Sequence, residues 1–330
     1  MRGIGFSAIL MALLLFSVPI SAQVIDLDID DDKNGARPEI WQKAKAADVK
    51  QAEEAARKDA CMRLVESAYM LTVSSTRDIL DLMMKNDKVN EDFIKELGKT
   101  KALKSKYLED GTVRTKVCTT PKKVAEILKK LYSKVDWDLA EEDSVIAAIE
   151  PQAARVKKDM VIYGEGEGAL KGSVGEKRIP VRRAAKVEAE KDIMVQILKL
   201  ILADYQYSKQ IRDFALKYKQ VPTKMALGMT TARIHSEEWQ PNGSVKMQVE
   251  VDVVKVTQLV YMAQTLYAPH LYYDGGFYSV VTATRDMIFN SDQTANAGAK
   301  GPKNGVLELE KEAVDEALKV KPAKRQPMVR

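Results

Sequence analysis

Two stretches of this chain, DGTVRTKV at 110–117 and NGSVKMQV at 242–249, resemble each other across 132 residues. In each stretch a turn-forming dipeptide that ends in glycine precedes residues that alternate between apolar and polar side chains. Asp, Asn and Gly tolerate the positive φ angles of tight turns, and period-two alternation is typical of a strand that leaves such a turn. The sequence therefore predicts two β-hairpins of the same kind.

A long helix is predicted upstream of each hairpin. Apolar residues recur there every four positions, which places them on one slowly drifting helical stripe. The first stripe comprises Ala52, Ala56, Ala60, Leu64 and Ala68, and the second, 133 positions later, comprises Ala185, Ala189, Ile193, Ile197 and Ile201. The matching register indicates a duplicated domain.

A further helix is predicted after each hairpin, with Thr120 as the cap and Pro121 in the first turn of the first of them. Strand-like stretches at 24–30 and 160–168 suggest that each unit begins with a strand. Helices with one apolar stripe and strands with one apolar face must bury those sides against each other. The expected fold class is α+β, as two tandem repeats, each a long helix and a second helix packed on one face of a small, mainly antiparallel sheet.

Residues 1–22 have the features of a secretory signal peptide. Arg2 supplies a positive charge, a short apolar stretch follows, and Pro19 and the small Ala22 precede the expected cleavage point. The apolar stretch is too short to span a bilayer, so the mature chain is expected to lack a transmembrane segment. We expect the mature protein in the periplasm, with secretion from the cell as the alternative.

The rest of the chain is expected to divide into five segments. These are a first repeat at 23–136, a linker at 137–154, a second repeat at 155–267, a C-terminal aromatic hairpin at 268–289, and at 290–330 a linker, a short helix and a basic disordered tail.

The charge balance and the cysteines limit the function classes. A formal net charge of +5 on 330 residues gives no sign of the concentrated basic face that nucleic-acid binding requires. The two cysteines of an exported chain could pair. However, Cys118 is expected on the outward strand face with Arg114 and Lys116, whereas Cys61 flanks the inward helical stripe, and a disulfide needs close Cα atoms. The sequence leaves the bonding state open.

Three patterns lack residues that the binding sites they resemble require. Asp30, Asp32 and Asn34 begin like a calcium loop, but Trp41 stands where that loop requires glutamate. The glycine-rich stretch at 164–175 has neither of the two common phosphate-loop spacings, and its glutamates would repel phosphate. The histidines and cysteines form no zinc-ligand pattern. We therefore expect no catalytic, cofactor-binding or metal-binding residues and no enzymatic activity, with an enzyme of an unrecognised class as the lesser alternative.

One aromatic group stands out near the C-terminus. Tyr272, Tyr273, Phe277 and Tyr278 are denser than aromatic residues elsewhere in a chain that is 6% aromatic. Tyrosine offers both contact area and a polar tip, which suits a binding surface. These four residues are the candidate partner surface, and additional core for the second unit is the alternative.

The chain also resembles a known family. The Ala-rich helix AEEAARKDACMRL, the following VSSTRD and the hairpin DGTVRTKV resemble the small bacterial outer-membrane lipoprotein family of about twenty kilodaltons. They are also similar to the N-terminal domain of flagellar assembly protein T, and IYGEGEG with RAAKVEAEKDI resembles the same pattern a second time. The resemblance implies an envelope protein with a binding or assembly role, associated with the flagellum or the outer membrane. This chain lacks the lipidated cysteine of the lipoproteins.

Overall fold

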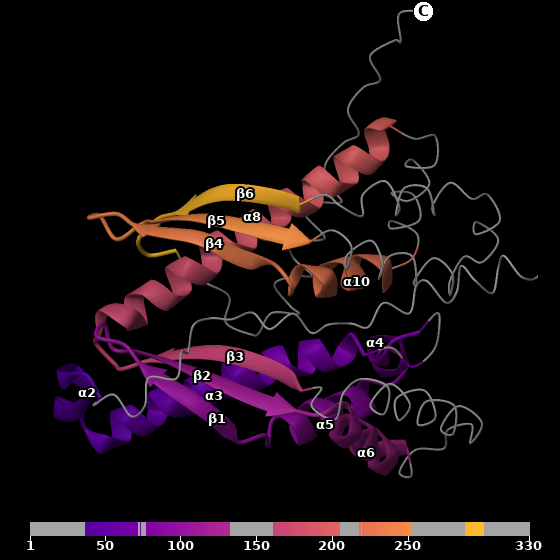
Figure 1. The fold of residues 1–330 in the computed structure, drawn as a ribbon, viewed down its shortest axis with the longest axis horizontal. Helices are drawn as coiled ribbons and strands as arrows, with labels where there is room; N and C mark the ends of the chain where they lie inside the picture. The colour runs from indigo at the N-terminus through magenta and orange to yellow at the C-terminus, as the bar shows by residue number, and fades with distance from the viewer. Residues whose placement is uncertain are drawn as a thin grey trace, which may run out of the picture.

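The computed structural model describes residues 37–71, 73, 77–132, 161–204, 218, 220–252 and 288–299, and it describes side chains for all of these except 197–204, 252 and 288–290. These residues form seven helices and two three-stranded antiparallel sheets (Figure 1). The α+β class is confirmed.

The first unit combines one sheet with the helices that pack on it. Its sheet has the order β1-β2-β3, and both strand pairs are antiparallel. In chain order its elements are α2 (Glu39–Lys43), α3 (Ala46–Tyr69), α4 (Ile79–Met83), α5 (Asp87–Leu97), β1 (Ala102–Tyr107), β2 (Thr112–Thr119), α6 (Pro121–Tyr132) and β3 (Ile162–Ala169).

The second unit contains the other sheet, which lies above the first in Figure 1. Its order is β4-β5-β6, and again both pairs are antiparallel. Its elements are α8 (Val174–Asp204), α10 (Gln220–Met229), β4 (Arg233–Trp239), β5 (Val245–Asp252) and β6 (Ile288–Ala295).

The two hairpins have the same turn, with equivalent hydrogen bonds. Gly111 and Gly243 have φ angles of 84° and 79°, the left-handed conformation that glycine adopts without strain. Asp110 Oδ1 accepts a hydrogen bond from the backbone N–H of the residue two positions on, and Asn242 Oδ1 does the same. Each hairpin also has one register irregularity, and the two lie 132 residues apart in β1 and β4. The predicted hairpins are confirmed.

Helix α3 lies directly on strand β3, because both surfaces consist of very small residues. The predicted stripe of α3 is buried from Ala52 to Ala68, and β3 presents alternate glycines to it. A Cβ atom added to Gly166 would lie 2.1 Å from the backbone nitrogen of Ala60, and one added to Gly164 would lie 2.0 Å from the oxygen of the same residue. Side chains on this strand face would therefore push the helix away from the sheet.

Helix α8 packs on the second sheet with larger residues. Ala185, Ala189 and Ile193 of the predicted stripe are buried, and they meet the apolar face of β5. Strand β6 occupies the position that β3 holds in the first sheet, since β2 pairs Thr115 with Gly166 and β5 pairs Met247 with Gln293. The helix–strand contact in this unit therefore accommodates side chains on both surfaces.

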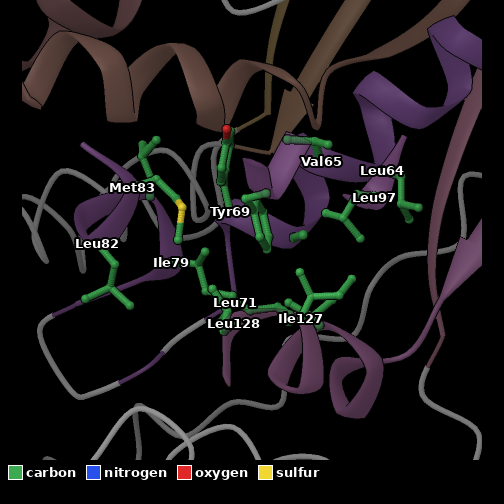
Figure 2. Packing of buried hydrophobic residues seen from close by; sticks show 14 of the residues in the cluster. Leu64, Val65, Tyr69, Leu71, Ile79, Leu82, Met83, Leu97, Ile127 and Leu128 are labelled. Carbon is green, nitrogen blue, oxygen red and sulfur yellow. The ribbon is translucent and has the colours of Figure 1, made fainter. Parts of the chain in front are cut away.

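The core of the first unit continues beyond its sheet between α3, α5 and α6. Figure 2 shows Tyr69, Leu97, Ile127 and Leu128 converging there from these three helices. Tyr69 stacks on Phe93 at a centroid distance of 5.8 Å. Thr120 Oγ1 caps α6 by accepting from the N–H of Lys123, with Pro121 as first residue, as the sequence predicts. This core positions α4, which contributes to the site described below.

Two segments differ from their predicted places. The strand at 160–168, expected to open the second unit, is β3 and pairs with β2 of the first sheet. The first residues of the expected linker at 290–330 belong to β6, which pairs with β5. Each of these two strands is the third strand of its sheet. Each unit therefore includes, in chain order, a long helix, a hairpin and a final strand. The predicted signal peptide at 1–22, the strand at 24–30, the linker at 137–154, the helix after the second hairpin and the features beyond 300 lie outside the described residues.

Candidate functional site at the interface between the two units

A lysine from the second unit is buried between two carboxyl groups of the first. The amine Nζ of Lys224 on α10 lies 2.7 Å from Oδ2 of Asp78 and 2.7 Å from Oδ2 of Asp81. The side chains of the three residues are at most 1% exposed. A buried charge is costly unless it is paired and hydrogen-bonded, so these three groups depend on one another.

Local sequence explains how both sides of this cluster are held. Asp78 is the N-cap of α4, and its Oδ1 accepts from the backbone N–H of Asp81 at 3.1 Å. Asp81 Oδ2 accepts in return from the N–H of Asp78, which completes a capping box. On α10, Lys224 and Leu227 are three residues apart and so share one face. Leu227 packs into the core of the first unit, so Lys224 faces the same way.

The environment of Asp78 changes its acidity. Burial raises the pKa of Asp78 to about 6; Lys224 opposes this effect, whereas the nearby carboxyl group of Asp81 adds to it. Two carboxyl groups thus share one ammonium group in a site without water access.

A second buried charged group lies where α3 faces α8. Glu66 is 1% exposed; its Oε2 lies 3.4 Å from Arg63 Nη1, and within the described residues its Oε1 has no hydrogen-bond partner. Lys186 Nζ and Glu190 Oε1 of α8, which are 3.0 Å apart, and Asp59 of α3 are the other charged groups acting on it. Burial raises the pKa of Glu66 to about 7, opposed by Arg63 and Lys186 and reinforced by Asp59 and Glu190.

This carboxyl group should make stability depend on pH. The pKa of Glu66 is 4.5 when exposed and about 7 in the folded protein, so its contribution is complete below the first value and is lost as the pH rises through the second. From about pH 5 to about pH 8 we expect a loss on the order of 1–3 kcal/mol of unfolding free energy. Glu66→Gln should remove most of this loss, as measured by denaturant titration at both pH values.

Glu188→Gln is the matched control for that experiment, because Glu188 lies on α8 and its side chain is 58% exposed. It should keep the wild-type pH dependence. An equal pH dependence in both variants would show that Glu66 does not titrate in this range.

A third set of charges crosses the interface beside β3. Arg182 of α8 contacts Glu167 of β3 and donates from Nε to Glu237 of β4 at 2.6 Å. Arg183 donates to Asp59 Oδ2 at 2.7 Å. Burial would raise the pKa of Glu167, but Arg182 and Arg114 outweigh it and hold this pKa below its usual range. Glu167 therefore stabilises the protein at neutral pH, and this contribution is lost as the pH falls below the usual glutamate range.

The glycine-rich stretch and Trp41, both considered from the sequence as parts of binding sites, have structural roles. Gly164, Gly166 and Gly168 form the surface on which α3 packs. Trp41 is buried against Tyr107 and donates from Nε1 to the backbone oxygen of Leu108 at 2.9 Å.

The other candidates are only partly described. The candidate partner surface, Tyr272, Tyr273, Phe277 and Tyr278, lies outside the described residues, as does His270. His235 is exposed, and its Nδ1 lies 3.1 Å from Glu250 Oε1.

The two cysteines are free. Cys61 is buried, and its thiol donates to the backbone oxygen of Thr100 at 3.6 Å. Burial raises the pKa of the Cys61 thiol, although Arg57 opposes this effect. Cys118 is half-buried on β2. The thiol of Cys61 is therefore held in its less reactive, protonated form.

A shallow cleft of about 210 Å³ lies between the ends of α5, α6 and β2. Two of the three lysines that line it are paired with glutamates of their own segments: Lys99 with Glu96, and Lys123 with Glu126. These pairs are solvent-exposed, so they contribute little to any binding of charged ligands.

Sequence reasoning did not identify the buried interface charges. A signal was nevertheless available, since Asp81 stands within the apolar run ILDLMM and Lys224 within VPTKMALGM. Charged residues inside apolar runs are almost never fully buried unless they are paired. Two such residues of opposite sign in different units indicate an interface ion pair.

Comparisons of this chain with protein-family models, with curated proteins and with solved structures gave no match. Within the described residues, no helix combines the length and the apolar composition that crossing a membrane requires. The same residues contain no cluster of three or more acidic, histidine or cysteine side chains that could hold a metal ion.

Proposed function

We propose that this protein is a non-enzymatic component of the cell envelope, exported to the periplasm by its signal peptide, that binds or assembles other envelope proteins. The finer proposal, based on the resemblance in sequence, is an association with the flagellum or the outer membrane. Its two units would be tandem copies of one α+β domain. The identical turns and the equivalent irregularities of β1 and β4 support this duplication.

The observation that carries the proposal is the way the two units are joined. Lys224, Asp78 and Asp81 form a buried contact between the units, and Arg182 with Glu167 and Arg183 with Asp59 add further pairs at the same interface. Such contacts fix the orientation of the second unit on the first. A binding protein gains affinity when its surfaces are preorganised, because less conformational entropy is lost on association.

The second sheet also offers a polar surface on the face opposite its core. Glu238, Lys246 and Asp292 are exposed there, one on each strand of that sheet. Charges of both signs on a fixed sheet can select a partner by complementarity. We assign the main contact area to the aromatic group Tyr272, Tyr273, Phe277 and Tyr278, since aromatic residues dominate binding energy at interfaces.

The proposal is tested by fractionation and affinity capture. The full chain, with its own residues 1–22 and a C-terminal affinity tag, is expected in the periplasmic fraction and should capture envelope proteins from native cells. Replacing the four aromatic residues by serine should abolish that capture at an unchanged thermal midpoint. The reason is that these aromatic side chains supply most of the proposed contact area, and serine removes it.

The control is the exchange of Glu39 for lysine and Lys43 for glutamate. These exposed residues pair with each other on α2 of the first unit, away from the polar face of the second sheet, so the exchange keeps the net charge and should keep the capture. Recovery of the chain from the culture medium would favour the secreted alternative. If the four-serine variant unfolds, the aromatic residues are core of the second unit and the proposed contact area is wrong.

A further inference from the structure

The cluster of Lys224, Asp78 and Asp81 has a second chemical property beyond ion pairing. It holds a primary amine against one carboxyl group, with another carboxyl group beside both. These are the two reactants of amide formation together with a group that can move their protons. The reactants come from different units, so a bond between them would join the units covalently.

We propose that Lys224 and Asp78 condense into an intramolecular amide (isopeptide) bond, and that Asp81 transfers the protons. The bond is a covalent modification of the folded chain that ties α10 to the N-terminus of α4. It goes beyond the proposed binding role and does not depend on it.

Lys224 is the nucleophile. Its side chain is fully buried, and Nζ lies 2.7 Å from Asp78 Oδ2, so the nitrogen is already in contact with the group that it attacks. Transfer of one proton from this ammonium group to a carboxylate removes two charges from the apolar interior, where charges are costly. The resulting neutral amine has a free electron pair and reacts as lysine does when it is desolvated.

Asp78 is the electrophile. Its Oδ1 accepts from the backbone N–H of Asp81 at 3.1 Å, so a fixed donor stands where negative charge develops when the nitrogen attacks Cγ. The other oxygen, Oδ2, faces Lys224 and is the one that leaves. The raised pKa of Asp78, about 6, increases the fraction of this carboxyl group that is protonated and can lose water.

Asp81 is the proton carrier. Its Oδ2 lies 2.7 Å from Lys224 Nζ, within the range for direct proton transfer, and the N–H of Asp78 holds it there at 3.1 Å. It takes a proton from the amine and returns it to the departing oxygen. Asp81 is unchanged at the end of the reaction.

The reaction balances without any further reagent. A bond forms between Lys224 Nζ and Asp78 Cγ, and the bond from Cγ to Oδ2 breaks. Two of the three ammonium protons leave with that oxygen as water, so an ammonium group and a carboxylate give one neutral amide and one water molecule. The fold supplies the driving force by holding the two groups together at high effective concentration.

The decisive experiment is peptide mapping of the purified full chain. Trypsin cleaves after Arg77 and after the next lysine, Lys85, and it releases 220–233 as one piece only if Lys224 is acylated, since it cleaves after unmodified lysine. We expect one linked species that contains 78–85 joined to 220–233, with the mass of one water missing. Fragment spectra should place the bond between residues 78 and 224. A mass of the whole chain that is lower by one water is not sufficient evidence, because the Asp110–Gly111 pair could also lose water by forming a cyclic imide. The linked peptides are therefore the deciding observation.

Two variants test the assigned roles. Lys224→Arg should give no linked species, because the guanidinium group is a poor nucleophile. Asp81→Asn should retain the fold, since the amide oxygen of asparagine can still accept from the backbone N–H of Asp78, but should show at most a tenth of the wild-type linkage because the carboxylate that takes up the proton is lost. Undiminished linkage in Asp81→Asn would overturn the role of Asp81. Recovery of 78–85 and 220–224 as separate peptides from folded wild-type protein would overturn the bond itself.

Discussion

Replacing Lys224 with methionine should destabilise the protein by about 3–5 kcal/mol at neutral pH. Lys224 is the cation that lies 2.7 Å from both Asp78 and Asp81, and the side chains of the three residues are at most 1% exposed. In the variant, two buried carboxyl groups remain with neither an ammonium group nor an amide bond to the lysine nitrogen beside them. Methionine fills a similar volume, so the effect reports the charge rather than a cavity. Denaturant unfolding of the two proteins gives the difference directly.

The matched control is Lys123→Met on α6. Lys123 is 57% exposed and pairs only with Glu126 at the surface, so we expect a change within about 0.5 kcal/mol. The loss in Lys224→Met should be smaller at about pH 5, because the buried carboxyl group of Asp78, whose pKa burial raises to about 6, then takes up a proton and loses its charge. Equal thermal midpoints for the two methionine variants would show that the buried cluster does not hold the units together.

A triple variant separates the charge from the contact. Asn at positions 78 and 81 together with Met at 224 removes every charge of the cluster but keeps the N-cap, since asparagine is as good a cap as aspartate. Replacing a complete buried ion pair by neutral groups is often close to neutral in stability. The triple variant should therefore recover the part of the loss in Lys224→Met that comes from unpaired buried charge.

Local patterns predicted much of this fold because they depend on residues close in sequence. The turns follow from Asp110–Gly111 and Asn242–Gly243, whose glycines have the expected positive φ angles. The helical stripes follow from a four-residue period, and their described members are buried. Neither inference requires knowledge of which strand pairs with which.

Strand pairing was harder to predict because it is a long-range property. The GEGEG stretch alternates as a strand should, but alternation does not name the sheet that the strand joins. The choice follows from complementary sizes: the glycines of β3 fit the alanine stripe of α3, whereas the corresponding stripe of α8 contains Ile193. Size matching between a helix stripe and a strand face was available in the sequence as the signal for β3.

Strand β6 was missed for a different reason. From residue 290 on its sequence, NSDQTA, is polar and favours a linker, yet these residues belong to the third strand of the second sheet. Ser291, Gln293 and Ala295 are the described positions of β6 that face α8. The hydroxyl of Ser291 donates to Asp192 Oδ2 of α8 at 2.8 Å, and Ala295 packs in the core of the second unit. A strand at a sheet edge beside a helix can thus be polar on both faces. Removal of 290–330 would delete most of β6, so we expect this truncation to destabilise the second sheet.

The closest helix–strand contact gives the other large effect. Gly166→Val should destabilise the protein by at least about 3 kcal/mol, because overpacking of a rigid contact forces the backbone to shift. The new Cβ atom would lie 2.1 Å from the nitrogen of Ala60 and 2.4 Å from the oxygen of Ala56, and both are helix backbone atoms that cannot rotate away. Helix α3 would have to lift from β3, which separates the core of the first unit. Thermal unfolding followed by circular dichroism measures the loss.

The control places the same residue at the equivalent position of the second sheet. Gln293 pairs with Met247 as Gly166 pairs with Thr115, and it already carries a half-buried side chain. Gln293→Val should therefore change stability by less than about 1 kcal/mol, since valine is smaller than glutamine and favours strands. A milder loss for Gly166→Val than for Gln293→Val would mean that α3 does not lie on the glycine face of β3. The expected order, with the glycine position far more sensitive, follows from backbone contact in one unit and side-chain contact in the other.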